Sequence, residues 1–421
     1  MGLLNGLRLT ARRLLRSRSL RNLVFLITVY VLLDALRFQR RVTSAPRHDP
    51  TRPRHPGRVY IAGMHYNDEG IIKTHWNKAV LDLVEALGRD NVYVSVYESG
   101  SWDDTKTALR ELDAELAGRG VRRNVVLDER THAEEVEDVP AEGEARQGWI
   151  MTPRGKREMR RIPFLAKLRN LTLKDLWKLG EEGEMFDTVL FLNDVVFTTE
   201  DVLTLLDTNG GLFAAACSLD FERPPSYYDT FALRDSAGQA TLMQTWPYFR
   251  SEASREAMLA YSNAVPVRSC WNGIVAMPAA PFLANRGRRL EFRGVADSLA
   301  EEAHLEASEC CLIHVDNPLT EDLGVFVNPR VRVGYSPAAY DAVHPADGGS
   351  WLSVWRIMAG VWEARVRRVL TGDRLKEWVV RKRFTEWEAG GVGDKEKRSE
   401  KGVDCLVNEG QVLVYNGWAH V

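Results

Sequence analysis

Cysteine and histidine are scarce in this sequence of 421 residues, which holds five of the first and nine of the second. The cysteines lack C-x-x-C spacing and there is no H-E-x-x-H motif, so the patterns typical of zinc sites are missing. No G-x-S-x-G motif occurs either, which leaves a metal-dependent hydrolase as a minor alternative for the function. An odd cysteine count leaves at least one thiol free or paired with another chain. A single disulfide from Cys270 to Cys310 or Cys311 is compatible with an oxidising compartment, and spacing alone does not assign it.

The sequence also has no excess of one charge. Lysine and arginine number 56, aspartate and glutamate number 58, and the net charge is -2. Domains that bind nucleic acid usually carry a marked basic excess. No nucleic-acid partner is therefore expected.

Long apolar runs are missing except at residues 23–36, which follow an arginine-rich start. This run is shorter than the roughly 20 residues that cross a bilayer comfortably, so a signal-peptide core and a basic helix lying on a membrane surface are alternatives. Arg37, Arg40 and Arg41 follow the run, where a cleavable peptide would have small residues. The pattern favours an uncleaved signal anchor.

The anchor divides the chain into a basic cytosolic tail, a transmembrane segment, a Pro/Arg-rich stem, a main domain and a C-terminal helical or flexible extension. Their expected bounds are 1–22, 23–36, 37–57, 58–345 and 346–421. Because nearly all of the polar chain follows the anchor, we expect a single-pass type II protein with a luminal main domain. A Golgi or other secretory-pathway membrane is the expected location.

Short apolar runs alternate with segments of helical period through the main domain. Strands are expected near 59–64, 91–98, 125–127, 186–194 and 211–220, with helices between them. This alternation predicts an α/β fold with a mostly parallel central sheet flanked by helices. Ligands of such sheets bind beyond the carboxyl ends of the strands.

Two motifs at or near strand ends could bind a nucleotide. ESGSWDDT places Glu98, Ser99 and Ser101 after a strand, where they could hold a nucleoside, although a helix cap explains the pattern equally well. FLAKLRN places Arg169 on a helix, where its guanidinium could neutralise a diphosphate, and a solvated arginine is the alternative.

Three further motifs could complete a site. VLFLNDVVF ends an apolar strand at Asp194, a candidate ligand for Mn²⁺ or Mg²⁺, with a helix cap or turn as the alternative. CWNG offers Trp271 as an aromatic wall beside the Asn272 amide, although tryptophan is also a common core residue. SECCLIHVDN, read as surrounding a short strand, offers His314 or Asp316 as a second metal ligand, although a lone histidine is more often structural.

Together and in this order, the motifs resemble one family, the fungal capsule-associated α-1,3-mannosyltransferases. The resemblance runs from about residue 59 to 335 and includes HYNDEG, YESGSWDDTK, LRN, LFLNDVVF, CSLDFE, YYDTFALRD, CWNG, EFRG, SECCLIHVDN and VNPRVRVGYS. It implies a type II membrane protein whose domain 58–345 has the GT-A nucleotide-sugar-binding fold. The implied donor is GDP-mannose with Mn²⁺ (or Mg²⁺), and the implied acceptor is a mannose-containing glycan.

Matched motif by motif, the resemblance assigns roles to residues of this chain. Glu98 and Ser99 would lie in the nucleotide pocket, and Arg169 and Asn170 would lie close to the donor. Asp194 would bind the metal, but it departs from the general D-x-D pattern, so His314 or Asp316 must complete the site.

An α-linked product from an α-linked donor would mean retention of configuration. Glu309 is the favoured catalytic carboxylate and Asp220 the second choice, with Asp229 and Asp235 near acceptor hydroxyls. Another nucleotide sugar is the nearest rival donor. A non-catalytic luminal homologue needed for polysaccharide synthesis or export is the rival function, because the second aspartate of D-x-D is missing.

Asn170-Leu171-Thr172 is the one N-glycosylation sequon. A glycan there would block a donor pocket, so we expect Asn170 to be unmodified.

Overall fold

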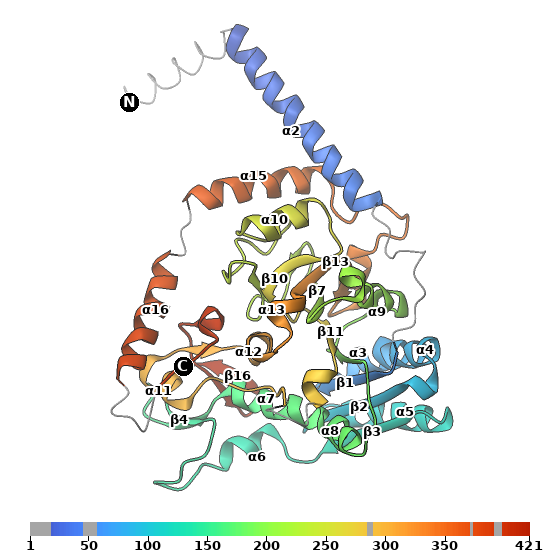
Figure 1. Ribbon diagram of the computed structural model, residues 1–421, viewed down its shortest axis with the longest axis vertical. Coiled ribbons are helices and arrows are strands. Elements are labelled where there is room, and N and C mark those ends of the chain that lie inside the picture. The colour runs from blue at the N-terminus through green and yellow to red at the C-terminus, as the bar shows by residue number, and fades with distance from the viewer. Residues whose placement is uncertain (1–17, 45–56, 284–288, 371–373, 391–397) are drawn as a thin grey trace.

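The computed structural model describes residues 18–44, 57–283, 289–370, 374–390 and 398–421 (Figure 1). Most of the expected cytosolic tail and of the stem lies outside these residues, as does part of the charged segment 381–402.

The N-terminal apolar run lies in a single long helix, α2 (Arg18–Ser44). Residues 18–43 are long and apolar enough to cross a membrane. Most of the large apolar side chains of this helix are exposed, including Phe25 at 65% and Leu33 at 61%. The helix is longer than the expected anchor because the arginines after residue 36 continue it instead of ending it.

Four neighbouring parallel strands form the first half of the main sheet, in the order β3-β2-β1-β6. They are β1 (Val59–His65), β2 (Val92–Ser99), β3 (Arg122–Asp128) and β6 (Thr188–Leu192). Their side chains alternate between two hydrophobic clusters, one on each face of the sheet. The expected α/β fold with a parallel core is confirmed in this half.

The second half of the sheet is mixed. β11 (Ile274–Pro278) runs antiparallel between β6 and β7 (Ala215–Arg223), and β13 (Val325–Gly334) is parallel to β7. Antiparallel β10 (Val265–Ser269) and β9 (Arg234–Asp235) complete that edge, and β8 (Ser226–Tyr227) pairs with β7. The antiparallel strands were not expected from the sequence.

Helices and short turns cover both faces. In chain order, the first of these are α3 (Glu69–Ile71), η1 (Ile72–Trp76), α4 (Asn77–Leu87), η2 (Arg89–Asn91), α5 (Thr105–Gly118) and α6 (His132–Glu137). Next along the chain come α7 (Arg161–Thr172), α8 (Lys174–Glu181), α9 (Thr199–Leu206), η3 (Thr208–Gly211), α10 (Glu252–Leu259) and η4 (Ala280–Leu283). The remainder are α11 (Asp297–Ala303), α12 (Glu309–Asp316), α13 (Thr320–Leu323), α14 (Pro337–Val343), α15 (Val354–Leu370), α16 (Arg374–Ala389) and η5 (Val403–Cys405).

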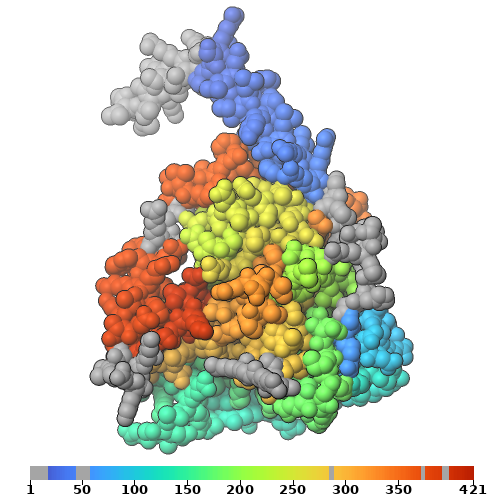
Figure 2. Space-filling view, viewed as in Figure 1, coloured from blue at the N-terminus to red at the C-terminus, as the bar shows by residue number. Residues whose placement is uncertain are grey.

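Three small two-stranded sheets lie outside the main one. They pair β4 (Trp149–Met151) with β5 (Arg157–Met159), β12 (Glu306–Ala307) with β14 (Leu406–Val407), and β15 (Gln411–Val414) with β16 (Gly417–His420). The second pair joins the C-terminal extension to the main domain. The extension is therefore packed against that domain rather than separate from it (Figure 2).

The expected strand around SECCLIHVDN is wrong, because these residues form helix α12. Its start is fixed by Ser308, whose hydroxyl accepts a hydrogen bond from the amide of Cys310 at 3.2 Å.

Two disulfides are present, and neither is the expected one. Cys217 is joined to Cys270, and Cys311 is joined to Cys405, while Cys310 is a free buried thiol. Neighbouring residues of a helix point about 100° apart, so Cys310 and Cys311 face different parts of the protein. Sequence spacing could not show which cysteine of α12 meets which partner.

Candidate active site at the carboxyl edge of the sheet

Asp194 lies two residues beyond the carboxyl end of β6 and is held there by its neighbour Asn193. The Asn193 amide donates to the Gly273 carbonyl at 3.0 Å, and its own carbonyl accepts from Trp76 Nε1 at 3.0 Å. Its side-chain oxygen accepts from Trp271 Nε1 at 3.1 Å. This loop is therefore fixed on both sides, and the Asp194 carboxylate is presented at the edge of the sheet.

The carboxylates at this edge repel one another. Burial raises the pKa of Asp194 well above its usual range, and the nearby charges of Asp68 and Asp220 raise it further. Burial also raises the pKa of Asp220 to about 6, with Asp229 adding to the effect. The pKa of Asp229 is raised by burial and, to a smaller extent, by Glu309. A divalent cation bound here would relieve this repulsion, so the residues fit the metal that the resemblance implies.

Asp220, in the C-terminal half of β7, is fully buried and held by three donors. The side-chain amide of Asn272 donates to it at 2.9 Å, the backbone amide of Asp229 at 3.2 Å, and the hydroxyl of Tyr335 at 3.2 Å. Hydrogen bonds of this kind fix the orientation of a carboxylate. Asn272 of the CWNG motif and Asp220 of the CSLDFE motif are therefore in direct contact.

Gly273 lets the CWNG turn pass close to Asp220. Its φ is +92°, and a Cβ atom here would lie 2.5 Å from Val333 Cγ2 and 3.3 Å from Asp220 Cβ. Neither the backbone angle nor the space accepts a side chain. The glycine is therefore needed to hold Asn272 against the carboxylate.

Arg169 and Glu309 form a buried ion pair beside Trp271. Arg169 Nε donates to Glu309 Oε1 at 2.9 Å, and the guanidinium carbon lies 4.4 Å from the centre of the Trp271 ring. The same guanidinium lies 5.8 Å from the Phe292 ring. Three candidates from separate motifs, Arg169, Trp271 and Glu309, therefore meet on one side of Asp194.

Glu98 and the serines after β2 form a closed turn. The Glu98 carboxylate is fully buried, accepts a hydrogen bond from the Ser101 amide and lies 3.3 Å from Lys106 Nζ. Ser101 Oγ accepts from the Asn67 amide at 3.0 Å, and Ser99 is buried. These contacts join the loops that follow β1 and β2, so Glu98 and Ser101 shape this part of the edge.

The C-terminal hairpin β15–β16 reaches the same region, which the sequence did not suggest. Tyr66 Oη, after β1, donates to Asn416 Oδ1 at 2.7 Å, and the Arg161 guanidinium lies 4.4 Å from the Trp418 ring. The Asn416-Gly417 pair between two apolar segments is typical of a hairpin turn, so the sequence does predict the hairpin itself but not where it packs. The hairpin joins the extension to the loops beside the candidate site.

His314 and Asp316 do not meet Asp194, which corrects the expectation that they complete a metal site. His314 Nε2 donates to the Cys270 carbonyl at 2.7 Å, and burial lowers its pKa to about 4, so the ring is neutral at physiological pH. Asp316 accepts two hydrogen bonds from Arg293, at 2.5 and 3.2 Å. Both residues lie on the C-terminal half of α12, whereas Glu309, at its start, is paired with Arg169.

Among the described residues, one group of three possible metal-ligand atoms lies within 4.8 Å, namely Cys217, Cys270 and His314. The two sulfurs are joined in a disulfide, so this group has no thiolate to offer. A cation at Asp194 would take at least some of its ligands from water and from a bound diphosphate, as Mg²⁺ often does.

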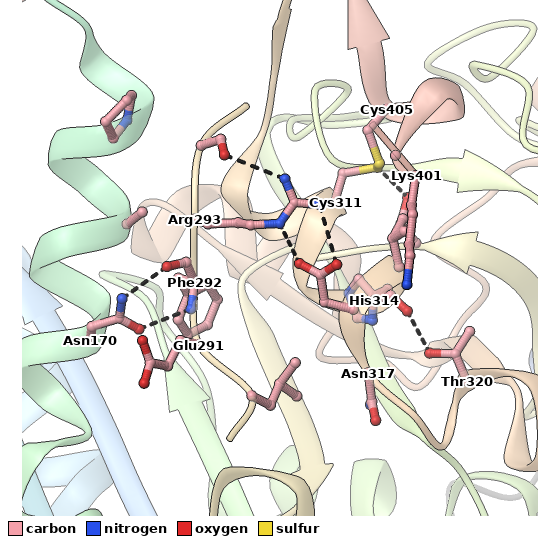
Figure 3. A pocket seen from close by; sticks show the side chains of 18 of the residues that line it. Asn170, Glu291, Phe292, Arg293, Cys311, His314, Asn317, Thr320, Lys401 and Cys405 are labelled. Carbon is pink, nitrogen blue, oxygen red and sulfur yellow. Dashed lines mark hydrogen bonds and ion pairs between the residues drawn. A yellow bond between two sulfur atoms is a disulfide. The ribbon is translucent and has the colours of Figure 1, made fainter. Parts of the chain in front are cut away.

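Asn170 is turned away from Arg169. Its amide donates to the Phe292 carbonyl at 2.8 Å, and its oxygen accepts from the Phe292 amide at 2.9 Å. With His314 and Asp316 it lines a separate cavity of about 1160 Å³, shown in Figure 3. Asn170 thus holds the 291–294 segment rather than pointing to Asp194.

Asp229 and Asp235 differ in position. Asp229 lies next to Asp220 and accepts from the amides of Phe231 and Ala232. Asp235 is fully buried on β9, where three backbone amides, including that of Ser251 at 2.7 Å, saturate its carboxylate. The expected acceptor contact is therefore wrong for Asp235.

Asn170 is expected to carry no glycan in the folded protein. Both polar atoms of its side chain are bonded to Phe292, and Thr172 is buried with its hydroxyl donating to the Arg169 carbonyl at 2.7 Å. Peptide mass spectrometry of protein from a glycosylating host should find the sequon unmodified. A glycan on Asn170 in active protein would contradict this placement of α7.

Replacement of Asp220 by asparagine is expected to make the protein progressively more stable than wild type as the pH rises from 4 to 7. The raised pKa means that the folded protein keeps a proton that the unfolded chain releases, so in wild type stability is lost between about pH 4 and about pH 6. A shift of this size corresponds to roughly 3 kcal/mol at neutral pH. Urea unfolding of metal-free protein at several pH values measures the difference, and a difference that does not vary with pH would contradict it.

The sequence of the chain matches one known protein family. A family model described as cryptococcal mannosyltransferase 1 matches residues 58–316, more than half of the chain. No curated protein matches the sequence significantly.

Three solved structures illustrate the structural likenesses. The mannosyltransferase PcManGT from Pyrobaculum calidifontis, in complex with GDP-Man and Mn²⁺, is 14% identical with a TM-score of 0.34, and the match covers 86% of this chain and 84% of that one. TarS of S. aureus is 12% identical with a TM-score of 0.37, over 80% of this chain and 50% of that one. Glucosyl-3-phosphoglycerate synthase from Mycobacterium tuberculosis, with Mn²⁺, UDP and glucosyl-3-phosphoglycerate, is 12% identical with a TM-score of 0.30, over 77% and 87%.

The ordered motifs, the loop that presents Asp194 and the match over residues 58–316 agree with one another. This chain is a glycosyltransferase-type protein that belongs to the family described as cryptococcal mannosyltransferase 1.

Proposed function

We propose that the chain is a GT-A-type mannosyltransferase that moves mannose from GDP-mannose to a mannose-containing glycan, forming an α-1,3 linkage with retention of configuration. The observation that carries this proposal is the set of mutually repelling carboxylates around Asp194 at the carboxyl edge of the sheet. A folded protein keeps such a set at a cost in stability, and ligand binding at the site offsets that cost.

Each part of the edge has a proposed task. A divalent cation at Asp194, Mn²⁺ or Mg²⁺, would stabilise the charge of the departing diphosphate as a Lewis acid. Arg169 supplies a fixed positive charge beside it, since its guanidinium is oriented by Glu309 and Trp271. Glu98, Ser99 and Ser101 shape the nucleoside side through the turn after β2.

The reacting sugar would lie between Arg169 and Asp220. Trp271 and Asn272 form the wall there, and both are held by hydrogen bonds to Asn193 and Asp220. Glu309 and Asp220 are the two buried carboxylates available to stabilise positive charge on the anomeric carbon. Glu309 remains the first choice, because Asp220 already accepts three hydrogen bonds.

We also propose that α2 anchors the protein as a type II membrane protein of the Golgi or another secretory-pathway compartment. The helix is long and apolar enough to cross a bilayer. Two disulfides fit an oxidising lumen, where such bonds persist.

One observation favours a second function, that of a non-catalytic luminal homologue. Leu192 and Val196 stand two positions before and after Asp194, so D-x-D is absent from this loop, and among the described residues no group of three possible ligand residues includes Asp194. A protein of this kind would assist polysaccharide synthesis or export without turnover.

The test is donor turnover by the full chain in nanodiscs, measured against a panel of nucleotide sugars. GDP release from GDP-mannose that requires Mn²⁺ or Mg²⁺ and increases with added mannobiose would support the transferase. Release from a different nucleotide sugar would change the donor. A folded sample that binds and turns over none of them would favour the non-catalytic function.

A further inference from the structure

Helix α15 lies across the end of the body from which α2 projects, and the two helices are in contact (Figure 1). Ala35 and Phe38 of α2 share a small cavity with α15, on whose side it is lined by Met358, Val361 and, toward the exposed face, Trp362 and Arg365. Phe38 also packs edge-on against Trp246, with ring centres 5.8 Å apart. The C-terminal half of α2 is thereby held against the body, while its first half stands free (Figure 2).

The face of α15 that packs on the body consists of small or single aliphatic residues. Ile357, Gly360 and Ala364 are its buried positions. A Cβ atom at Gly360 would lie 2.1 Å from the Trp246 carbonyl oxygen, so the helix approaches the body very closely there. These positions recur at i, i+3 and i+7, which is one side of a helix.

The opposite face carries the large apolar side chains. The exposed set, at 41% to 84% of full exposure, is Trp355, Trp362, Val366, Val369 and Leu370. At 3.6 residues per turn this set forms a stripe centred roughly opposite the buried positions. A helix on the surface of a soluble domain has the reverse arrangement, so this stripe needs a cover.

Arginines line both sides of the stripe. At 3.6 residues per turn, Arg356 and Arg367 fall on one flank and Arg365 on the other. The Arg365 guanidinium lies 4.8 Å from the centre of the Trp362 ring. Tryptophan and arginine together, beside an apolar stripe, are typical of helices that lie in a membrane interface.

The contact with α2 sets the depth at which α15 would lie. It involves residues 31–38, at the C-terminal end of the apolar run, and Arg37, Arg40 and Arg41 follow directly. Basic residues at the end of a spanning helix lie among the lipid headgroups. A helix packed against this part of α2 would therefore lie at the same level.

We propose that α15 is an interfacial helix that lies in the headgroup region of the membrane crossed by α2, with Val366 and Val369 directed to the acyl chains. The inference rests on the proposed anchoring by α2. It gives the C-terminal extension a task, which is to hold the main domain against the bilayer. Leu375 and Trp378 at the start of α16, 72% and 56% exposed, would extend the contact.

The test uses the full chain in nanodiscs of phosphatidylcholine and phosphatidylserine, labelled at single introduced cysteines with an environment-sensitive fluorophore. Native cysteines do not interfere, because four are in disulfides and Cys310 is buried. The variants are Val369→Cys in α15, Phe25→Cys in α2 and Val139→Cys as the control. Val139 is an exposed valine just after α6, at the opposite end of the body from α15 (Figure 1).

The expected result is blue-shifted emission and quenching by nitroxide-labelled lipid at Val369 and Phe25, with neither effect at Val139. If Phe25 is in lipid and Val369 behaves like Val139, the inference is overturned while the anchor stands. If neither position is in lipid, both the anchor and the inference fail, while the transferase activity is still measured separately. Leu370→Cys gives a second position on the same stripe if the label at 369 perturbs the helix.

Discussion

Asp194→Asn is expected to remove transferase activity while leaving the protein folded and at least as stable as wild type at neutral pH. The substitution keeps the shape of the side chain but removes the charge that would bind the cation. Loss of one element of transition-state electrostatic stabilisation typically lowers kcat by about 10²–10³-fold. The same change removes the buried carboxylate whose pKa is raised by burial and, to a smaller extent, by Asp68 and Asp220, so stability should not fall.

The measurement is initial-rate GDP release together with thermal unfolding of the same preparation. Asp322→Asn is the matched control, because Asp322 is an exposed aspartate on α13 outside the candidate site. The control should retain wild-type rate and melting temperature. Full activity of the Asp194 variant would contradict the metal-binding role, and unfolding of this variant alone would show that the aspartate is structural.

Removing the Cys311–Cys405 disulfide is expected to cause the largest loss in the free energy of unfolding among the substitutions proposed for the buried part of the protein. The bridge joins α12 to the C-terminal extension across 94 residues of sequence, and a loop of this length corresponds to about 4.7 kcal/mol in the chain-entropy model. The double variant Cys311→Ser, Cys405→Ser should therefore unfold at clearly lower denaturant concentration. Cys310 offers a control within the same helix, since it is buried and unpaired.

Cys310→Ser should cost much less than the double variant, because it removes no covalent link. Chemical unfolding under oxidising and reducing conditions separates the two effects. A reductant should destabilise the wild type more than the double variant, because the wild type loses both disulfides and the double variant loses only Cys217–Cys270. Equal stability of the double variant and the Cys310 variant would show that the bridge adds nothing to the folded state.

The strands and the edge that carries the site could be predicted because they follow local rules. VLFLND ends a buried strand at Asn193, and the carboxyl edge of parallel strands is where polar residues gather. Short apolar runs likewise predicted β1 and β2 to within one residue, and β7 with an overlap over residues 215–220. The sequence therefore predicts that Asp194 and Asp220 lie at the same edge of the sheet, although it does not show the contacts around them.

The errors come from long-range contacts that no local pattern contains. Whether His314 faces a metal or the Cys270 carbonyl depends on which side of α12 packs on the sheet. The pairing of Cys311 with Cys405 depends on where the extension returns, about 90 residues later. Asn170 sits next to Arg169 in sequence, yet the turn of α7 directs the two side chains to different neighbours.

The placement of the C-terminal extension was also beyond the sequence. Of its tryptophans, Trp351 and Trp387 are buried, whereas Trp355 and Trp378 are exposed. The sequence alone does not separate a tryptophan that fills a core from one that faces lipid. The burial of each side chain in the folded protein distinguishes the two groups.

The most direct test of the central claim is equilibrium binding of GDP to the wild-type chain and to Asp194→Asn, measured by calorimetry with and without Mn²⁺. The account predicts binding by the wild type that strengthens with Mn²⁺ and with rising pH, as the raised pKa of Asp194 requires, and loss of the metal-dependent part in the variant. Equal binding by both proteins, or no effect of Mn²⁺ on either, would contradict a metal-assisted donor site at this edge of the sheet.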